Sequence, residues 1–179
     1  PYDWAKFLRE RLDYVGPRAP LGGIEGGGYK LVYNDAPNQM ILDDESIDGH
    51  LDLTNSIGIV LEQDGTIRDV IHGMVGYRAG IGPGMKIQAV NGRRWSIKTM
   101  RNAVENSVKE TKPLKLLVAN GGFVETYEID YHDGIRYPHL EHAQGSSDYL
   151  DEIIKPLAPE NATGLSPAER RNASKRGGK

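Results

Sequence analysis

The chain has 179 residues, a net charge of −3 and no cysteine, which excludes disulfides, thiolate zinc sites and cysteine nucleophiles. This length suffices for one domain with a well-formed core, and no apolar run is long enough to span a bilayer. The weak charge predicts neither a nucleic-acid nor an anionic-membrane partner. The chain opens with PYDWAKFLRERL, without an initiator Met or signal-peptide features, so we expect a piece of a longer protein.

The first fifty residues predict a helix and a strand separated by a glycine-rich break. Apolar residues recur at helical spacing over residues 3–14, and YKLVYN, residues 29–34, alternates as a strand does. The intervening GPRAPLGGIEGGG is expected to interrupt regular structure. MIL, residues 40–42, is expected to begin another strand. Residues 43–52 are interpreted as a solvated acidic loop, because their acids lack the spacing and central glycine of an EF-hand calcium loop.

The most regular pattern begins at Ile57. Its elements in order are strands at 57–62 and 66–71 around an Asp-Gly turn signal, a short helical turn ending on Gly80, a strand before the Asn91-Gly92 turn, a helix from Ser96 to about Val108, and strands at 114–119 and 123–131. Short connections between alternating strands predict a mixed α+β fold. We expect a small half-open antiparallel β-barrel with two flanking helices.

The pattern weakens after Tyr131. SSDYLDEIIKPL contains one short predicted helix, and the residues after it have too little apolar surface to fold. The predicted organisation is a helix and strand extension packing on the module (1–50), a central module (51–132), a C-terminal extension with a short helix (133–158) and a disordered tail (159–179).

Two motifs of the central module match those of a known family. SIGI, residues 56–59, is similar to an apolar-Gly-apolar carboxylate-binding loop, and MVGYRAGIGPGMKIQAVNG is similar to the passage that follows that loop. Together they resemble a PDZ domain, although the usual Asp after Gly84 is replaced here by Met85-Lys86. The resemblance implies that an extended peptide adds as a strand between the strand after this loop and the second helix.

Gly58 interrupts the predicted groove strand, where glycine permits an inward turn of successive amides. The amides of Ile57, Gly58 and Ile59 could form a nest for a terminal carboxylate. Apolar side chains of one strand face and of the second helix are expected to line a pocket, and Arg101 to meet an acidic ligand side chain. The predicted peptide-binding residues are Ser56, Ile57, Gly58, Ile59, Leu61, Ile97, Arg101 and Val104. In the alternative interpretation, Gly58 permits a bulge and the isoleucines belong to the core.

The run before the loop, DDESIDGHLDLTN, contains several acids and no Lys or Arg. Many PDZ domains place a basic residue there, close to the ligand carboxylate. An internal peptide, or a segment of the parent protein, could therefore fill the groove instead of a free C-terminus.

The flanks of the module carry a second resemblance. FLRERLDYVGPRAPLGGIEGGGYKLVYNDAPN before it, and YHDGIRYPHLE and DYLDEIIKPL after it, are similar to the C-terminal region of the glycyl aminopeptidase family of zinc metallopeptidases. The similarity extends over residues 1 to about 157. It implies a bacterial parent with a thermolysin-like HExxH catalytic domain upstream, and it is compatible with a periplasmic or secreted protein. The sequence itself establishes no compartment.

No catalytic motif lies in this chain. A zinc peptidase needs two His one helical turn apart and a Glu, whereas HLEH, residues 139–142, has a spacing of three and follows Pro138 in a predicted loop. The sequence also lacks a G-x-S-x-G motif and a P-loop. We therefore expect no enzymatic activity and no cofactor in this fragment, with zinc confined to the absent catalytic domain.

The leading functional hypothesis is a non-catalytic PDZ domain of a zinc aminopeptidase-like protein. It would bind a peptide C-terminus or an extended peptide segment by β-strand addition and assist or regulate the missing peptidase domain. The alternative is a structural module that packs on the catalytic domain or on a second subunit with its groove occluded. Residual hydrolysis by the fragment is the third and weakest hypothesis.

Overall fold

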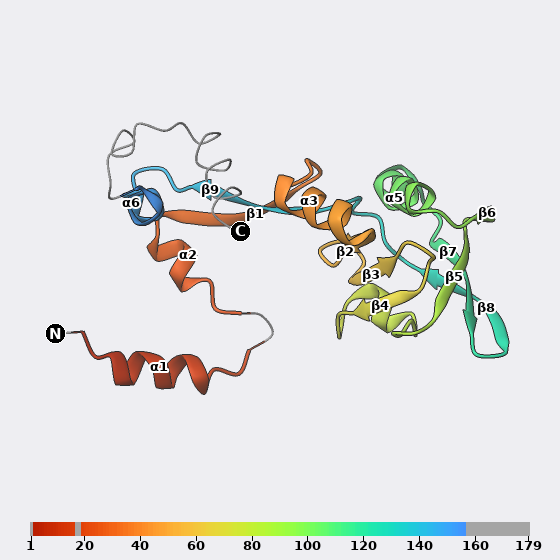
Figure 1. Ribbon diagram of the computed structural model, residues 1–179, viewed down its shortest axis with the longest axis horizontal. Helices are drawn as coiled ribbons and strands as arrows, with labels where there is room; N and C mark the ends of the chain where they lie inside the picture. Colours follow the sequence, from red (N-terminus) through yellow and green to blue (C-terminus); the bar gives the residue numbers. More distant parts are fainter. Residues whose placement is uncertain (1, 17–18, 157–179) are drawn as a thin grey trace, which may run out of the picture. The chain divides into compact units, whose positions relative to one another are not determined.

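The computed structural model describes residues 2–16 and 19–156. Its contacts divide the chain into two units, one of Leu31–Glu141 and one of Pro1–Lys30 with His142–Lys179. The order of the elements along the chain can be followed in Figure 1. The predicted tail, residues 159–179, lies outside the described residues, and no described helix is both long and apolar enough to cross a membrane.

The smaller unit contains three helices: α1 (Trp4–Leu12), α2 (Gly22–Gly26) and α6 (Tyr149–Ile154). The Asp3 side chain accepts from the Lys6 N–H at 2.9 Å and caps α1, which lies within the helix predicted over residues 3–14. Asp148 caps α6 in the same way and also accepts from the Tyr29 hydroxyl at 2.9 Å. The short helix α2 lies in a stretch that was expected to have no regular structure.

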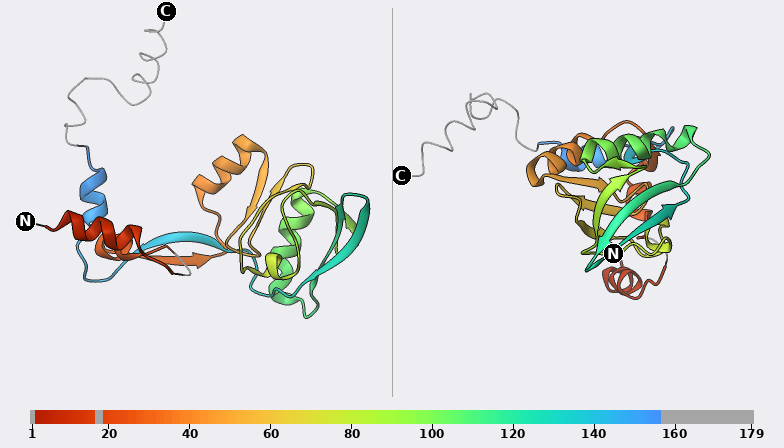
Figure 2. Two further views of the ribbon diagram at one scale, coloured as in Figure 1. Left: turned by 90° about the horizontal axis from the view of Figure 1, so that it is seen from below. Right: turned by 90° about the vertical axis from the view of Figure 1, so that its right-hand side faces the viewer.

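Strand β1 (Tyr29–Asn34) pairs with β9 (Tyr137–His142) in a two-stranded sheet, which Figures 1 and 2 show as neighbouring ribbons. The β1 prediction is confirmed, but the loop predicted at HLEH is wrong. Pro138 stands in this two-stranded sheet, where a residue without an N–H is tolerated. The side chain of Asn38 donates to the Pro138 carbonyl at 3.1 Å, which joins the two segments.

Two antiparallel sheets, three helices and one 3-10 turn form the rest of the larger unit; the first of these helices, α3, is described below. One sheet has the order β2-β3-β4 and the other the order β6-β5-β7-β8. The elements are β2 (His50–Leu53), β3 (Ile59–Glu62), β4 (Ile67–Val70), α4 (Val75–Arg78), β5 (Lys86–Val90), β6 (Arg93–Arg94), α5 (Ile97–Asn106), a 3-10 turn (Ser107–Lys109), β7 (Leu114–Asn120) and β8 (Phe123–Ile129). The sheets do not close, so the predicted mixed α+β, half-open antiparallel architecture is confirmed.

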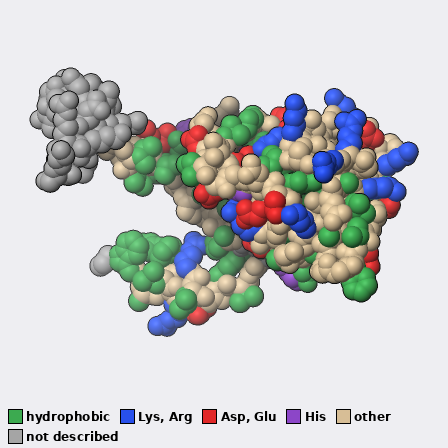
Figure 3. All heavy atoms as spheres, turned by 45° about the vertical axis from the view of Figure 1, so that its right-hand side comes forward, with side chains coloured by type: hydrophobic (Ala, Val, Ile, Leu, Met, Phe, Trp, Pro, Cys, Tyr) green, Lys and Arg blue, Asp and Glu red, His purple; other side chains and the backbone are tan. Residues whose placement is uncertain are grey.

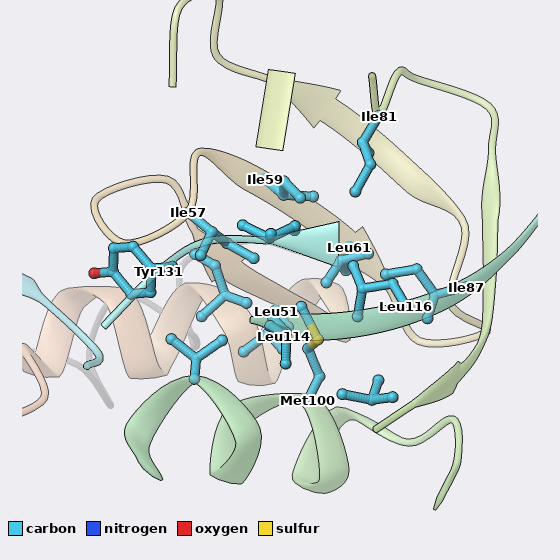
Figure 4. Close-up of a cluster of buried hydrophobic side chains, with 14 of the residues drawn as sticks. Leu51, Ile57, Ile59, Leu61, Ile81, Ile87, Met100, Leu114, Leu116 and Tyr131 are labelled. Carbon is cyan, nitrogen blue, oxygen red and sulfur yellow. The ribbon is translucent and has the colours of Figure 1, made fainter. Parts of the chain in front are cut away.

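The hydrophobic core lies between α5 and the strands (Figure 4). Helix α5 begins where the Ser96 side chain accepts from the Thr99 N–H at 3.0 Å, as its N-cap pattern predicted. It buries Met100 and Val104 against the strands. The apolar face of α5 therefore serves the core, which fixes this helix beside the predicted groove.

Residues 39–53 form a helix and a strand, α3 (Gln39–Asp48) and β2, so the strand predicted at 40–42 and the acidic loop at 43–52 are wrong. Asn38 caps α3 by accepting from the Met40 N–H at 2.9 Å, and Gly49 ends it with a φ of +66°. These capping signals outweigh the acidic composition that suggested a loop. Two polar residues of the segment, Glu45 and His50, are buried.

A substitution at Val104 tests whether this residue belongs to the core or lines an open groove. Its side chain is completely buried, whereas Val108 on the following turn is 62% exposed. We expect Val104→Asp to lower the free energy of unfolding by about 3 kcal/mol or more, because an unpaired carboxylate would enter the core. Val108→Asp should change it by no more than about 0.5 kcal/mol. Urea unfolding of the two variants compares them, and equal stability would show that Val104 faces solvent.

Candidate peptide groove

Strand addition requires a free edge on the groove strand, here β3, facing helix α5. Both edges of β3 are paired, one with β4 and the other with β2. Strand β2 also contacts α5 and α3. The chain therefore places its own strand β2 where an added peptide would lie.

The register of β2 brings two leucines onto the inner face of the groove. Leu51 lies opposite Leu61, and Leu53 lies opposite Ile59. Leu51 and Leu53 are 0% and 1% exposed, respectively, so both side chains are buried in the core. Figure 4 shows Leu51 on the helix side of Ile57 and Leu61. Period-two alternation turns Asp52, between the leucines, to the opposite face.

The amides of the SIGI loop converge on one acceptor. The N–H groups of Ser56, Ile57 and Gly58 donate to the Leu53 carbonyl at 3.0, 3.1 and 3.0 Å. A cluster of successive N–H groups forms a concave anion-binding or acceptor-binding site. Two of the three amides predicted for the ligand carboxylate, those of Ile57 and Gly58, thus hold a backbone carbonyl of the same chain, while Ile59 lies in β3.

Gly58 has a φ of +77°, a conformation that glycine adopts without strain. A Cβ at this position would lie 2.3 Å from the Cβ of Met74. The carbonyl of Gly58 also accepts from the Ile71 N–H at 2.8 Å. The glycine is therefore required by both the turn of the amides and the close approach of the segment before α4.

A buried polar contact closes the groove on the α3 side. Glu45 accepts from the Asp52 N–H at 2.9 Å through Oε1, and its Oε2 lies 2.6 Å from Nη2 of Arg101. Arg101 also donates to the Tyr137 hydroxyl. Burial raises the pKa of Tyr137, and the adjacent guanidinium opposes that rise. Arg101, predicted to meet an acidic ligand, is thus paired with an acid of α3.

Ser56 anchors the loop after β8 to the groove. Its hydroxyl oxygen accepts from the Arg136 N–H at 3.1 Å. Tyr131 in that loop donates to the Gly134 carbonyl at 2.7 Å. Burial raises the pKa of the Tyr131 hydroxyl to about 12, and the nearby Asp133 carboxylate acts in the same direction. The tyrosine therefore stays neutral and available as a donor at physiological pH.

The structure thus gathers the predicted site residues around β2. The groove-strand side chains and Val104 are completely buried, and Ile97 is half-buried against the same core. Their assignment to an external peptide stays a prediction. Sequence reasoning missed three residues: Leu51, Leu53 and Glu45. The alternation in HLDL was a usable signal for the leucines, whereas no local pattern marked Glu45 as a partner of Arg101.

Among the described residues, Asp44, Asp48 and His50 place one potential metal-ligand atom each within 4.8 Å of one another. Asp44 and Asp48 are exposed, and exposed acids commonly gather without a metal. His139, from HLEH, instead has its ring nitrogen 2.9 Å from the Ala36 carbonyl. That contact occupies one ring nitrogen of His139.

A polar hollow lies apart from the groove, between the end of β1 and the C-terminal end of α5. Its lining residues include Tyr33, Glu105, Lys109, Asp133 and Arg136. The Arg136 guanidinium stacks over the Tyr33 ring at 5.3 Å from its centroid. Acids and bases share this hollow, so it offers no single-sign field to a charged ligand.

Acidic and basic side chains are mixed on the face of the protein that Figure 3 shows. Exposed ion pairs join Lys86 to Asp64 at 2.6 Å and Lys115 to Glu128 at 2.7 Å. Such pairs neutralise the local field and add little stability. The surface pattern is compatible with the predicted lack of a nucleic-acid partner, which stays a prediction.

A scan against protein-family models and a search of curated proteins found no match. Among solved structures, the chain is similar to the crystal structure of the HtrA3 PDZ domain bound to a phage-derived ligand, FGRWV. The identity is 18%, the alignment covers 63% of this chain and 93% of that chain, and the TM-score is 0.32. The element order, the antiparallel pairings and the amide-lined loop of the larger unit agree with the half-open antiparallel α+β module expected from the sequence.

Gly58 in the SIGI loop and Gly73 before α4 provide a matched test of the close packing at Gly58. Gly58 and Gly73 have similar φ angles, +77° and +79°, but a Cβ on Gly73 would meet nothing within 4 Å. Gly73→Ala should cost about 1–2 kcal/mol of backbone strain alone. Gly58→Ala should lower the free energy of unfolding by about 3 kcal/mol or more, because the clash with Met74 adds to the strain. Chemical denaturation of both variants measures the difference, and equal losses would contradict the close approach.

Proposed function

We propose that this chain is a non-catalytic PDZ-like module that holds an extended peptide segment by β-strand addition. The observation that supports the proposal is the site that β2 occupies. This site combines the edge of β3, the wall formed by α5 and three convergent amides of the SIGI loop. Backbone groups supply affinity in this mode of recognition, and alternate side chains supply specificity. A peptide C-terminus or an internal extended segment would use the same seat.

The proposed parent is a bacterial zinc aminopeptidase-like protein. This part of the proposal is supported only by the resemblance of the flanking sequences to the glycyl aminopeptidase family. The described residues carry no catalytic feature of that family. In this proposal zinc belongs to a catalytic domain outside this chain. The module would present peptide or substrate segments to that domain, or regulate it.

A purely structural role is the second candidate. It is favoured by the depth at which β2 is buried, since Leu51 and Leu53 are almost completely inaccessible. In this role the filled groove would be a permanent part of the core, and the module would pack on a catalytic domain or on a second subunit. Peptide titration separates the two candidates.

Peptides that end in an apolar residue should perturb both walls of the groove. We expect chemical-shift changes at the amides of Ile57, Gly58 and Ile59 together with those of Ile97 and Val104, because an added strand lies between the walls. Affinity should be in the millimolar range, since peptide ordering offsets part of the interaction. A peptide with Asp in place of the terminal apolar residue is the control. If neither wall responds, the structural role becomes the better explanation.

The chain should hold no stoichiometric zinc and should hydrolyse no aminopeptidase substrate. The reason is the lack of an HExxH helix and of cysteine ligands in the sequence. Metal analysis after dialysis against zinc measures the zinc bound per chain. A peptidase assay with added zinc measures hydrolysis. One tightly held zinc per chain, lost in a His50→Ala variant, would instead identify the acidic corner of α3 and β2 as a metal site.

A further inference from the structure

We infer that α3 and β2 form a built-in occupant of the groove, which must move away before an external peptide can bind. This inference rests on the proposed peptide-binding function and concerns how the same site is regulated. The blocking strand is β2, His50–Leu53, and the helix that holds it is α3, Gln39–Asp48.

The occupant pairs with β3 and with the loop amides in the way expected of an added strand. It runs antiparallel to β3 along the full length of that strand, from His50 opposite Glu62 to Leu53 opposite Ile59. Its last residue places a carbonyl on the amides of the SIGI loop, where a ligand terminus would lie. A second strand cannot pair with this edge of β3 while β2 is present, so binding and occlusion exclude one another.

Glu45 connects the occupant to the far wall of the groove. One carboxylate oxygen accepts from the Asp52 N–H in β2, and the other pairs with Arg101 on α5. The Glu45 side chain is 8% exposed and that of Arg101 is 23% exposed. A Glu45→Ala substitution would remove both contacts at once without changing any residue of β3 or α5. Glu45 is therefore the residue that holds β2 in the groove; we call its contacts with the Asp52 N–H and with Arg101 the latch.

Two features make the occupant replaceable. His50, the first residue of β2, is 3% exposed, and its Nδ1 has no hydrogen-bond partner among the described residues. A buried polar atom without a partner is unfavourable, and a buried ion pair such as Glu45–Arg101 contributes less than its attraction suggests because both groups lose water. A peptide without these features can compete for the same edge.

The fit of β2 defines the class of peptide that would replace it. The groove holds two apolar side chains two residues apart, those of Leu51 and Leu53, and one backbone carbonyl on the loop amides. We therefore expect an extended peptide with an apolar-x-apolar sequence at the end that meets the loop. The intervening side chain faces away from the pocket and is free to vary.

The test uses the full chain and a labelled peptide that copies residues 47–53, IDGHLDL. The same peptide with both leucines replaced by Asp is the control. Glu45→Ala should bind the copied peptide about tenfold more tightly than the unsubstituted chain, because apparent affinity follows the fraction of open groove. Asp64→Ala is the matched variant, since it removes an acid whose oxygen also lies 2.6 Å from a basic nitrogen, that of Lys86. It should leave binding unchanged in a fluorescence anisotropy titration.

A reversible cross-link tests displacement directly. Asp52 and Val60 face one another across β2 and β3, so the pair D52C/V60C would join the occupant to the groove strand. Native cysteines are absent from the chain, so no other disulfide can form within it. The oxidised variant should lose binding by tenfold or more, and reduction should restore it. The control pair V60C/D69C joins β3 to β4 at another facing position and should bind equally in both redox states.

The outcomes separate the inference from the proposed function. Tighter binding by Glu45→Ala, together with loss of binding in the oxidised D52C/V60C chain, supports the built-in occupant. Equal binding by the oxidised and reduced D52C/V60C chains overturns it, while peptide binding itself stands. If the peptide binds neither the reduced chain nor Glu45→Ala, and the circular dichroism of both remains native, the proposed function fails and the inference fails with it.

Discussion

The pairing of β2 with the edge of β3 that faces away from β4 is the interaction on which the rest of the module depends. An unpaired edge leaves a row of backbone N–H and C=O groups that must find partners. Here a four-residue strand provides those partners and also places two leucines in the core. The hydrogen bonds from the SIGI loop to the Leu53 carbonyl fix the end of that strand. Backbone pairing, loop conformation and core packing therefore depend on one another.

The buried acid in α3, Glu45, is tolerated because β2 and α5 provide partners for its carboxylate. Glu45 leaves water when α3 covers the groove, and such a loss is tolerated only where the charge is paired and hydrogen-bonded. Arg101 and the Asp52 amide supply those partners. The polar contact links α3 to both β2 and α5.

In the proposed function, a covalently attached occupant such as β2 would compete with external peptides on unequal terms. Strand β2 is joined to the SIGI loop by a short turn, so its effective concentration at the groove is high. To displace β2, an external ligand would need better side-chain contacts than β2 makes, or a change that breaks the contacts of Glu45. In the proposed function the availability of the groove would depend on the state of α3, whereas a permanently held β2 would give the structural role.

Local sequence determined most of the elements. The N-cap at Ser96, the Asp-Gly turn between β3 and β4, and the alternation in β7 and β8 act over a few neighbouring residues, so their pattern predicts structure directly. The same holds for the SIGI loop, because the need for glycine at position 58 is a property of the backbone. Tertiary structure alone decided what fills the groove. The acids of residues 43–48 resemble a solvated loop until Glu45 meets Arg101, 56 residues away, and HLDL becomes an inner strand only when β3 and α5 provide its two walls. Burial of a charge depends on a distant partner, and no local pattern of residues specifies that partner.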